Sequence, residues 1–157
     1  FIVRWPGVVK PGSVCGQLAH QADVLATLAE ILGAKLPAGA GEDSFSLLPL
    51  LRGEDRPVRE HAVSCAANGV QGVRQGAWKL ICSAPPQLYN LAEDLGETRD
   101  LAAQQPERVK ELLALRERLI TDGRSTPGEP QKNDVDVIRL PATAAGAPKA
   151  KQRKGKK

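Results

Sequence analysis

The chain has 157 residues, 41% of them hydrophobic and 25% charged, a normal balance for a soluble protein with one ordinary core. Its formal charge of +4 comes from six basic residues among the last nine, without which 16 basic residues oppose 18 acidic ones. This balance argues against a nucleic-acid-binding body. No apolar run approaches the roughly 20 residues of a membrane span, and the given residues contain no charged-then-apolar pattern of the signal type.

The N-terminal segment predicts a strand and then a helix. Phe1–Arg4 is an apolar run typical of a buried strand, and a proline and a glycine end it. A helix begins at Asp23, which is placed to cap the first turn, and stops at Gly33. The apolar residues at helical spacing are Val24, Leu25, Leu28, Ile31 and Leu32. We expect Asp23 to be a helix cap and not a ligand.

A loop and a boundary follow this helix. Residues 34–42 are rich in Ala, Gly and Pro, after which Asp43 or Ser44 could cap a short apolar turn that ends at Leu51. Residues 53–57 are charged and lack periodicity. They are the best candidate for a boundary between subdomains.

The next segment predicts an antiparallel meander. Three runs of strand type, His61–Ala67, Val70–Arg74 and Trp78–Cys82, are separated by Asn-Gly and Gln-Gly turns. Hairpin-linked runs of this kind pair with their neighbours in sequence. Leu88–Leu91 could add another edge strand.

A second helix and a tail complete the chain. Pro106 suits the first position of a helix whose apolar stripe would cover one face of the small sheet, with Gly123 as its stop. From Ser125 onward, prolines, glycines and a lysine-rich end predict a linker and a disordered tail, in which Val135–Leu140 could dock.

The three cysteines, Cys15, Cys65 and Cys82, are odd in number and lack metal-ligand spacing. They indicate neither a zinc site nor a complete disulfide framework. One bridge between Cys65 and Cys82 stays open as an alternative.

Several segments together resemble the C-terminal part of the sulfatases, the arylsulfatase-like members of the alkaline-phosphatase superfamily. Their order and spacing over residues 1–127 carry the resemblance. The segments are Phe1-Ile2-Val3-Arg4-Trp5-Pro6-Gly7, Gln21-Ala22-Asp23-Val24-Leu25-Ala26-Thr27-Leu28, Asp43-Ser44-Phe45-Ser46-Leu47 with Leu50-Leu51-Arg52-Gly53, Val73-Arg74-Gln75-Gly76-Ala77-Trp78-Lys79-Leu80-Ile81, Gln87-Leu88-Tyr89-Asn90-Leu91 with Asp94, Glu97 and Leu101, and Gly123-Arg124-Ser125-Thr126-Pro127.

The resemblance implies a fold class and a division of the chain. The class is α/β, with residues 1–55 as the end of the large alkaline-phosphatase-like domain. Residues 56–127 would form an α+β C-terminal subdomain, a small antiparallel sheet packed by a helix. Residues 128–157 would be a basic, disordered tail outside the resemblance.

The resemblance also implies a chemistry whose central residues are not in this chain. A sulfatase hydrolyses sulfate esters with a formylglycine made from a Cys/Ser-x-Pro/Ala-x-Arg motif and with a calcium ion. None of the three cysteines is followed by that pattern, and the family's metal ligands come from upstream segments. We therefore assign no catalytic or metal residue, expect calcium and formylglycine only in a full-length enzyme, and predict that this chain alone is inactive.

What the chain would supply is part of a substrate cleft. In relatives, the strand before the Asn-Gly turn carries a His-His-Ser stretch that faces the cleft, where this chain has Ser64, Cys65 and Ala66, with Asn68 retained. We assign substrate binding to Ser64, Cys65 and Asn68, against ordinary packing in a half-buried strand. His61 would point to the opposite face from Ser64.

The partners expected from the resemblance are a sulfated small molecule or glycan and a missing N-terminal catalytic domain, in a periplasmic or secreted enzyme. Two alternatives remain: a stand-alone binding or scaffold module, and a phosphoester or phosphonate hydrolase of the same superfamily. The basic tail is either a solubilising end or a segment that binds anionic polymers through counterion release.

Overall fold

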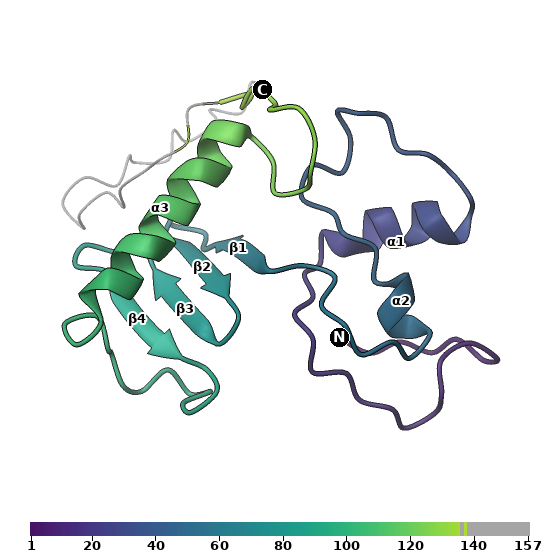
Figure 1. The fold of residues 1–157 in the computed structure, drawn as a ribbon, viewed down its shortest axis with the longest axis horizontal. Helices are drawn as coiled ribbons and strands as arrows, with labels where there is room; N and C mark the ends of the chain where they lie inside the picture. Colours follow the sequence, from purple (N-terminus) through teal and green to yellow (C-terminus); the bar gives the residue numbers. More distant parts are fainter. Residues whose placement is uncertain (136, 138–157) are drawn as a thin grey trace, which may run out of the picture.

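The computed structural model describes residues 1–135 and 137. Its elements in chain order are α1 (Asp23–Ile31), α2 (Leu48–Leu51), β1 (His61–Cys65), β2 (Gln71–Gln75), β3 (Trp78–Ile81), β4 (Gln87–Asn90) and α3 (Pro106–Asp122). Figure 1 shows the sheet and α3 on one side of the molecule and α1 with α2 on the other. Among the described residues, no helix has the length and apolar character that a membrane span requires.

The four strands form one antiparallel sheet in the order β1-β2-β3-β4, which confirms the predicted meander and the added edge strand. Gly69 and Gly76 take φ of 84° and 57° in the turns that follow β1 and β2. Left-handed backbone at these turns is what the glycine signals predicted. The α/β class with its small antiparallel sheet and packing helix is confirmed.

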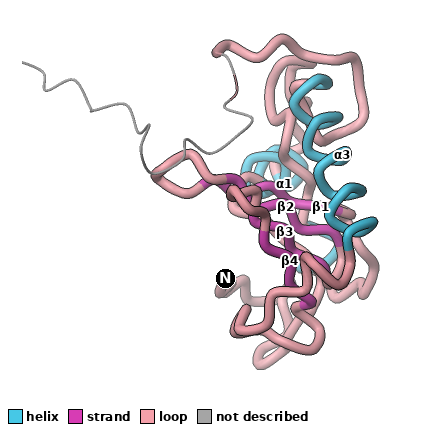
Figure 2. The backbone as a smooth tube through the Cα atoms, turned by 90° about the vertical axis from the view of Figure 1, so that its left-hand side faces the viewer, coloured by secondary structure: helices cyan, strands magenta, loops and turns pink. Residues whose placement is uncertain are grey.

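One face of the sheet is covered by α3, as the apolar stripe predicted (Figures 1 and 2). Val73, Leu80 and Leu88 point to that face and are fully buried with Leu112 of the helix. Because side chains alternate along a strand, Ala62, Ser64, Gly72, Arg74, Lys79, Ile81 and Tyr89 lie on the other face. We call this side, away from α3, the distal face.

Helix α1 forms where the periodicity predicts it, but its apolar stripe faces outward. Leu25 and Leu28 are 48% and 52% exposed, whereas Asp23 and Thr27 are buried. The prediction that Asp23 caps the helix is wrong, since the cap position is Ala22 and has no side-chain hydrogen bond. Asp23 is drawn inward because an arginine and two backbone N–H groups bind its carboxylate there.

Two further local predictions near the N-terminus are wrong. Phe1–Arg4 is not a strand, and Ile2 is 98% exposed, because no strand of the described sheet lies beside it. Neither Asp43 nor Ser44 caps α2, whose cap position is Leu47. Ser44 instead accepts the Ala26 N–H at 2.8 Å and donates to the Ala22 carbonyl, which fixes its loop to α1.

The segment after α3 is held against the rest of the chain. Gly123 ends the helix in the left-handed conformation, and the Ser125 and Thr126 N–H groups both donate to the Glu42 carbonyl. Gln131 N–H donates to the Asp122 carbonyl at 2.8 Å. Hydrogen bonds therefore hold the start of the predicted linker as a strap, residues 124–133. Val135 is 76% exposed, and residues 136 and 138–157, which include most of the segment expected to dock and the basic tail, lie outside the described residues.

Candidate functional site on the distal face of the sheet

The three residues assigned to substrate binding lie near the end of β1 but do not share one surface. Ser64 is on the distal face opposite Gly72, whereas Cys65 pairs with Gln71 on the α3 side, where Arg116 of the helix binds Gln71. Asn68 lies in the turn, and its Oδ1 accepts the Val70 N–H at 3.1 Å. All three are exposed. The alternation of a strand separates Ser64 from Cys65.

Two cations stand opposite each other on the distal face. Arg74 of β2 and Lys79 of β3 are register partners, and like charges in that position repel. Lys79 Nζ is compensated by Glu97 Oε1 at 2.6 Å. Arg74 Nε donates to the Gly76 carbonyl at 3.1 Å, and no carboxylate of the described residues forms an ion pair with this guanidinium.

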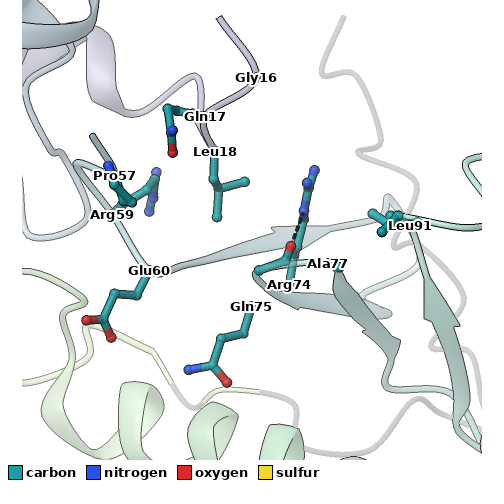
Figure 3. Close-up of a pocket in the computed structure, with 12 residues that line it drawn as sticks. Gly16, Gln17, Leu18, Pro57, Arg59, Glu60, Arg74, Gln75, Ala77 and Leu91 are labelled. Carbon is teal, nitrogen blue, oxygen red and sulfur yellow. Dashed lines mark hydrogen bonds between the residues drawn. The ribbon is translucent and has the colours of Figure 1, made fainter. Parts of the chain in front are cut away.

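A hollow of about 500 Å³ adjoins Arg74. Its walls come from residues 16–18, from the segment before β1, from the β2–β3 turn and from the residues after β4. Figure 3 shows the Arg74 guanidinium pointing away from the sheet on the side of Leu18, while Gln75 points the other way. A second hollow of about 820 Å³, between residues 1–19 and α2, shares Arg74 and residues 16–18 with the first.

Arg59 also lines the first hollow, but its guanidinium already forms an ion pair with Asp23. Its Nη1 lies 2.8 Å and 3.0 Å from the two carboxylate oxygens of Asp23, and its Nε donates to the His61 carbonyl. The guanidinium also stacks 5.1 Å from the centre of the Phe45 ring. This pair joins α1 to the start of β1, a role that the sequence did not indicate.

His61 is buried on the α3 side of β1, opposite in face to Ser64 as predicted. Neither ring nitrogen has a hydrogen-bond partner among the described residues. Burial and the charges of Arg59 and Arg118 lower the pKa of the imidazole, so it is held neutral. The imidazole points away from the distal face.

Several proteins of known activity are similar to this chain in sequence. It is 38% identical over 138 residues to the N-acetylgalactosamine-6-O-sulfatase of Bacteroides thetaiotaomicron, which covers 77% of this chain and 27% of that protein. It is 32% identical over 144 residues to arylsulfatase A of Homo sapiens, covering 71% of this chain and 28% of the relative. The chain is homologous to the C-terminal part of sulfatases. It spans about a quarter of the length of these relatives.

Solved structures agree with the sulfatase assignment. A Bacteroides thetaiotaomicron structure from work on glycosaminoglycan metabolism superimposes with a TM-score of 0.68 at 37% identity, over 75% of this chain and 28% of that one. A structure in complex with its substrate D-glucosamine-2-N,6-O-disulfate gives a TM-score of 0.60 at 23% identity, which supports the fold alone. No protein-family model matches the chain.

The described residues do not fit the calcium ion and formylglycine of a sulfatase. They contain no group of three or more His, Cys, Asp or Glu side chains that could hold a metal. All three cysteines are free thiols, so no bridge joins Cys65 to Cys82. Burial raises the pKa of the Cys82 thiol, which disfavours the thiolate. We therefore derive no sulfatase reaction step through residues of this chain.

Proposed function

We propose that this chain is the C-terminal part of a sulfate-ester hydrolase, in which it closes the fold and forms one wall of the substrate cleft. The catalytic centre, with calcium and formylglycine, would lie in another part of the protein. Homology to sulfatases over most of the chain, together with its span of about a quarter of their length, supports this proposal.

The observation that carries the proposal is the inverted helix α1. A surface helix normally buries its apolar stripe and exposes its polar one. Here Leu28 and Leu32 are 52% and 78% exposed, while Asp23 and Thr27 are buried. An apolar helix face of this kind favours a covering partner, and in the proposed protein that partner is the missing N-terminal catalytic domain.

The proposed division follows the predicted boundaries. Residues 1–55 would belong to the large domain, residues 56–127 would form the C-terminal subdomain, and residues 128–157 a basic tail. The buried Asp23–Arg59 pair would then hold the two folded parts together. By the same resemblance, the enzyme would be periplasmic or secreted.

We propose a sulfated glycan as the substrate class, because the N-acetylgalactosamine-6-O-sulfatase is a relative at 38% identity. Ser64 on the distal face and Asn68 in the neighbouring turn remain the proposed contacts from the wall. Cys65 points to the other face, so its proposed contact requires substrate to reach around the end of β1.

A chimera tests the proposal directly. The matching 138-residue region of the Bacteroides sulfatase is replaced by this chain and produced in a host that forms formylglycine. We expect calcium-dependent hydrolysis of 4-nitrophenyl sulfate by the chimera, and none by the isolated 157-residue chain. The same assay with 4-nitrophenyl phosphate separates sulfate-ester from phosphoester hydrolysis. A folded chimera without sulfatase activity, or turnover by the isolated chain, contradicts the proposal.

A matched pair of variants tests the role of α1. Leu25→Gln with Leu28→Gln should leave the free energy of unfolding of the isolated chain within about 0.5 kcal/mol, because both side chains are exposed there. In the chimera the same change should lower the folded yield. Glu30→Gln, exposed on the same helix, should have no effect in either protein. Equal chimera yields for all variants would show that the stripe is not covered.

A further inference from the structure

The Arg74 side chain comes from a strand in the middle of the sheet, and only one of its guanidinium nitrogens donates a hydrogen bond among the described residues. It projects from β2, which is paired on both sides by β1 and β3, so its base is fixed by two hydrogen-bonded neighbours. Nε donates to the Gly76 carbonyl, which orients the planar group. Among the described residues its other two nitrogens have no hydrogen-bond partner and no ion-pair partner. Donors of the guanidinium fork therefore remain available.

The other cations near Arg74 already have carboxylate partners, whereas Arg74 has none among the described residues. Lys79, directly opposite, is neutralised by Glu97, and Arg59 by Asp23. Glu60 also lines the hollow but makes no ion pair with Arg74 among the described residues. The absence of a paired carboxylate favours an external oxyanion at this position.

The hollow has the size and lining of a ligand site and not of a gap for one protein side chain. Its volume of about 500 Å³ falls in the range of about 300–1,000 Å³ typical of small-molecule pockets. Leu18, Pro57 and Leu91 give it apolar walls against which the C–H face of a sugar ring can pack. Beside these walls lie the polar side chains of Gln17, Glu60 and Gln75, and ligand sites commonly combine apolar walls with polar groups that orient the ligand.

We propose that Arg74 binds the oxyanion, a sulfate or a carboxylate, of a glycan unit seated in this hollow. A guanidinium offers two parallel N–H donors to such a group. This inference rests on the proposed function for the identity of the ligand as a glycan. It adds a recognition residue on the distal face to Ser64.

Titration of the 157-residue chain tests the site without any turnover. The amide signals of Gly76 and Ala77 are followed by NMR during addition of N-acetylgalactosamine 6-sulfate, glucuronic acid or N-acetylgalactosamine. We expect shifts with the first two sugars, or with one of them, and none with the neutral sugar. The two acidic sugars show whether sulfate or carboxylate is preferred. Raising the salt concentration should weaken the binding.

Variants decide whether Arg74 is responsible. Arg74→Gln should weaken binding at least tenfold, Arg74→Lys should weaken it less, and Arg99→Gln, an exposed loop arginine outside the hollow, should leave it unchanged. Equal affinity in Arg74→Gln, an equal loss in Arg99→Gln, or no binding of either acidic sugar by the wild-type chain would overturn the site. Because sulfatase activity of the chimera is measured separately, an active chimera with no such binding overturns this site alone.

Discussion

Asp23 and Arg59, 36 positions apart in sequence, form an ion pair that is sealed from solvent. Arg59 Nη1 lies 2.8 Å from Asp23 Oδ1, and the two side chains are 2% and 0% exposed. The same carboxylate accepts the N–H groups of His20 and Phe45. One aspartate thus fixes the start of α1, the loop before α2 and the segment that leads into β1.

Removing one partner of this pair should be strongly destabilising. Asp23→Ala leaves the buried guanidinium without a counter-charge, so we expect the free energy of unfolding to fall by about 3–5 kcal/mol. Urea denaturation followed by circular dichroism measures the change. Glu54→Ala, which breaks the exposed pair with Arg56, is the control and should cost at most about 1 kcal/mol. Equal costs for the two substitutions would contradict the structural role of the buried pair.

His61 should make the stability of the chain depend on pH. Burial, Arg59 and Arg118 lower its pKa in the folded state, against the opposing effects of Glu60 and Asp43. The unfolded state then binds more protons than the folded state as the pH falls through the unfolded value of about 6.5. The contribution of the neutral His61 to the free energy of unfolding is therefore fully present above that pH, and it is lost as the pH falls below it.

The thermal midpoint measured between pH 8 and pH 5 checks this expectation. His61→Leu should remove the part of the decline that begins near pH 6.5, because the variant has no buried imidazole to protonate. His20→Leu, which changes the other histidine, should keep that part of the decline. A decline of the same size in wild type and His61→Leu would place its origin in other groups.

Gly123 and Gly33 each follow the end of a helix and can be compared directly. Both take positive φ, 60° and 65°, but a Cβ at Gly123 would collide with the backbone of Gln131, whereas at Gly33 it would meet no atom within 4 Å. Gly33→Ala should therefore cost about 1 kcal/mol from backbone strain alone. Gly123→Ala should cost more and should also release the strap, residues 124–133.

Hydrogen exchange of the strap measures this second effect. The Ser125 and Thr126 N–H groups, which donate to the Glu42 carbonyl, should lose protection in Gly123→Ala and keep it in Gly33→Ala. Unchanged protection in both variants would mean that the strap can move to accept the added methyl group without detaching.

The three thiols should differ in reactivity. Cys15 and Cys65 are exposed, whereas Cys82 is 4% exposed and its pKa is raised by burial. With Ellman's reagent at pH 8 we expect two fast reactions and one slow one that becomes fast in urea, because only an accessible thiolate attacks the reagent. Three equally fast thiols in the native chain would contradict the packing of Cys82 under α3.

Periodicity and turn chemistry determined the elements themselves. Helix α3 and the four strands of the meander form where apolar spacing, Pro106, Gly69 and Gly76 place them, because these signals act through neighbouring residues. The order of segments such as Val73–Ile81 also predicted homology to sulfatases, and the similarity to known sulfatases confirms it. The sequence also predicted the position of helix α1, but not which of its side chains are buried.

Tertiary contacts decided the direction of α1 and the grouping of charges. Asp23, predicted as the cap of α1, turns inward because Arg59, distant in sequence, supplies its counter-charge. Ser64 and Cys65 are adjacent in sequence but lie on opposite faces, while Arg74 meets residues 16–18 across a hollow. Local sequence patterns predict helix and strand periods and turns, because these depend on neighbouring residues. Ion pairs and the walls of a site join residues that are far apart in sequence, and no local pattern indicates those contacts.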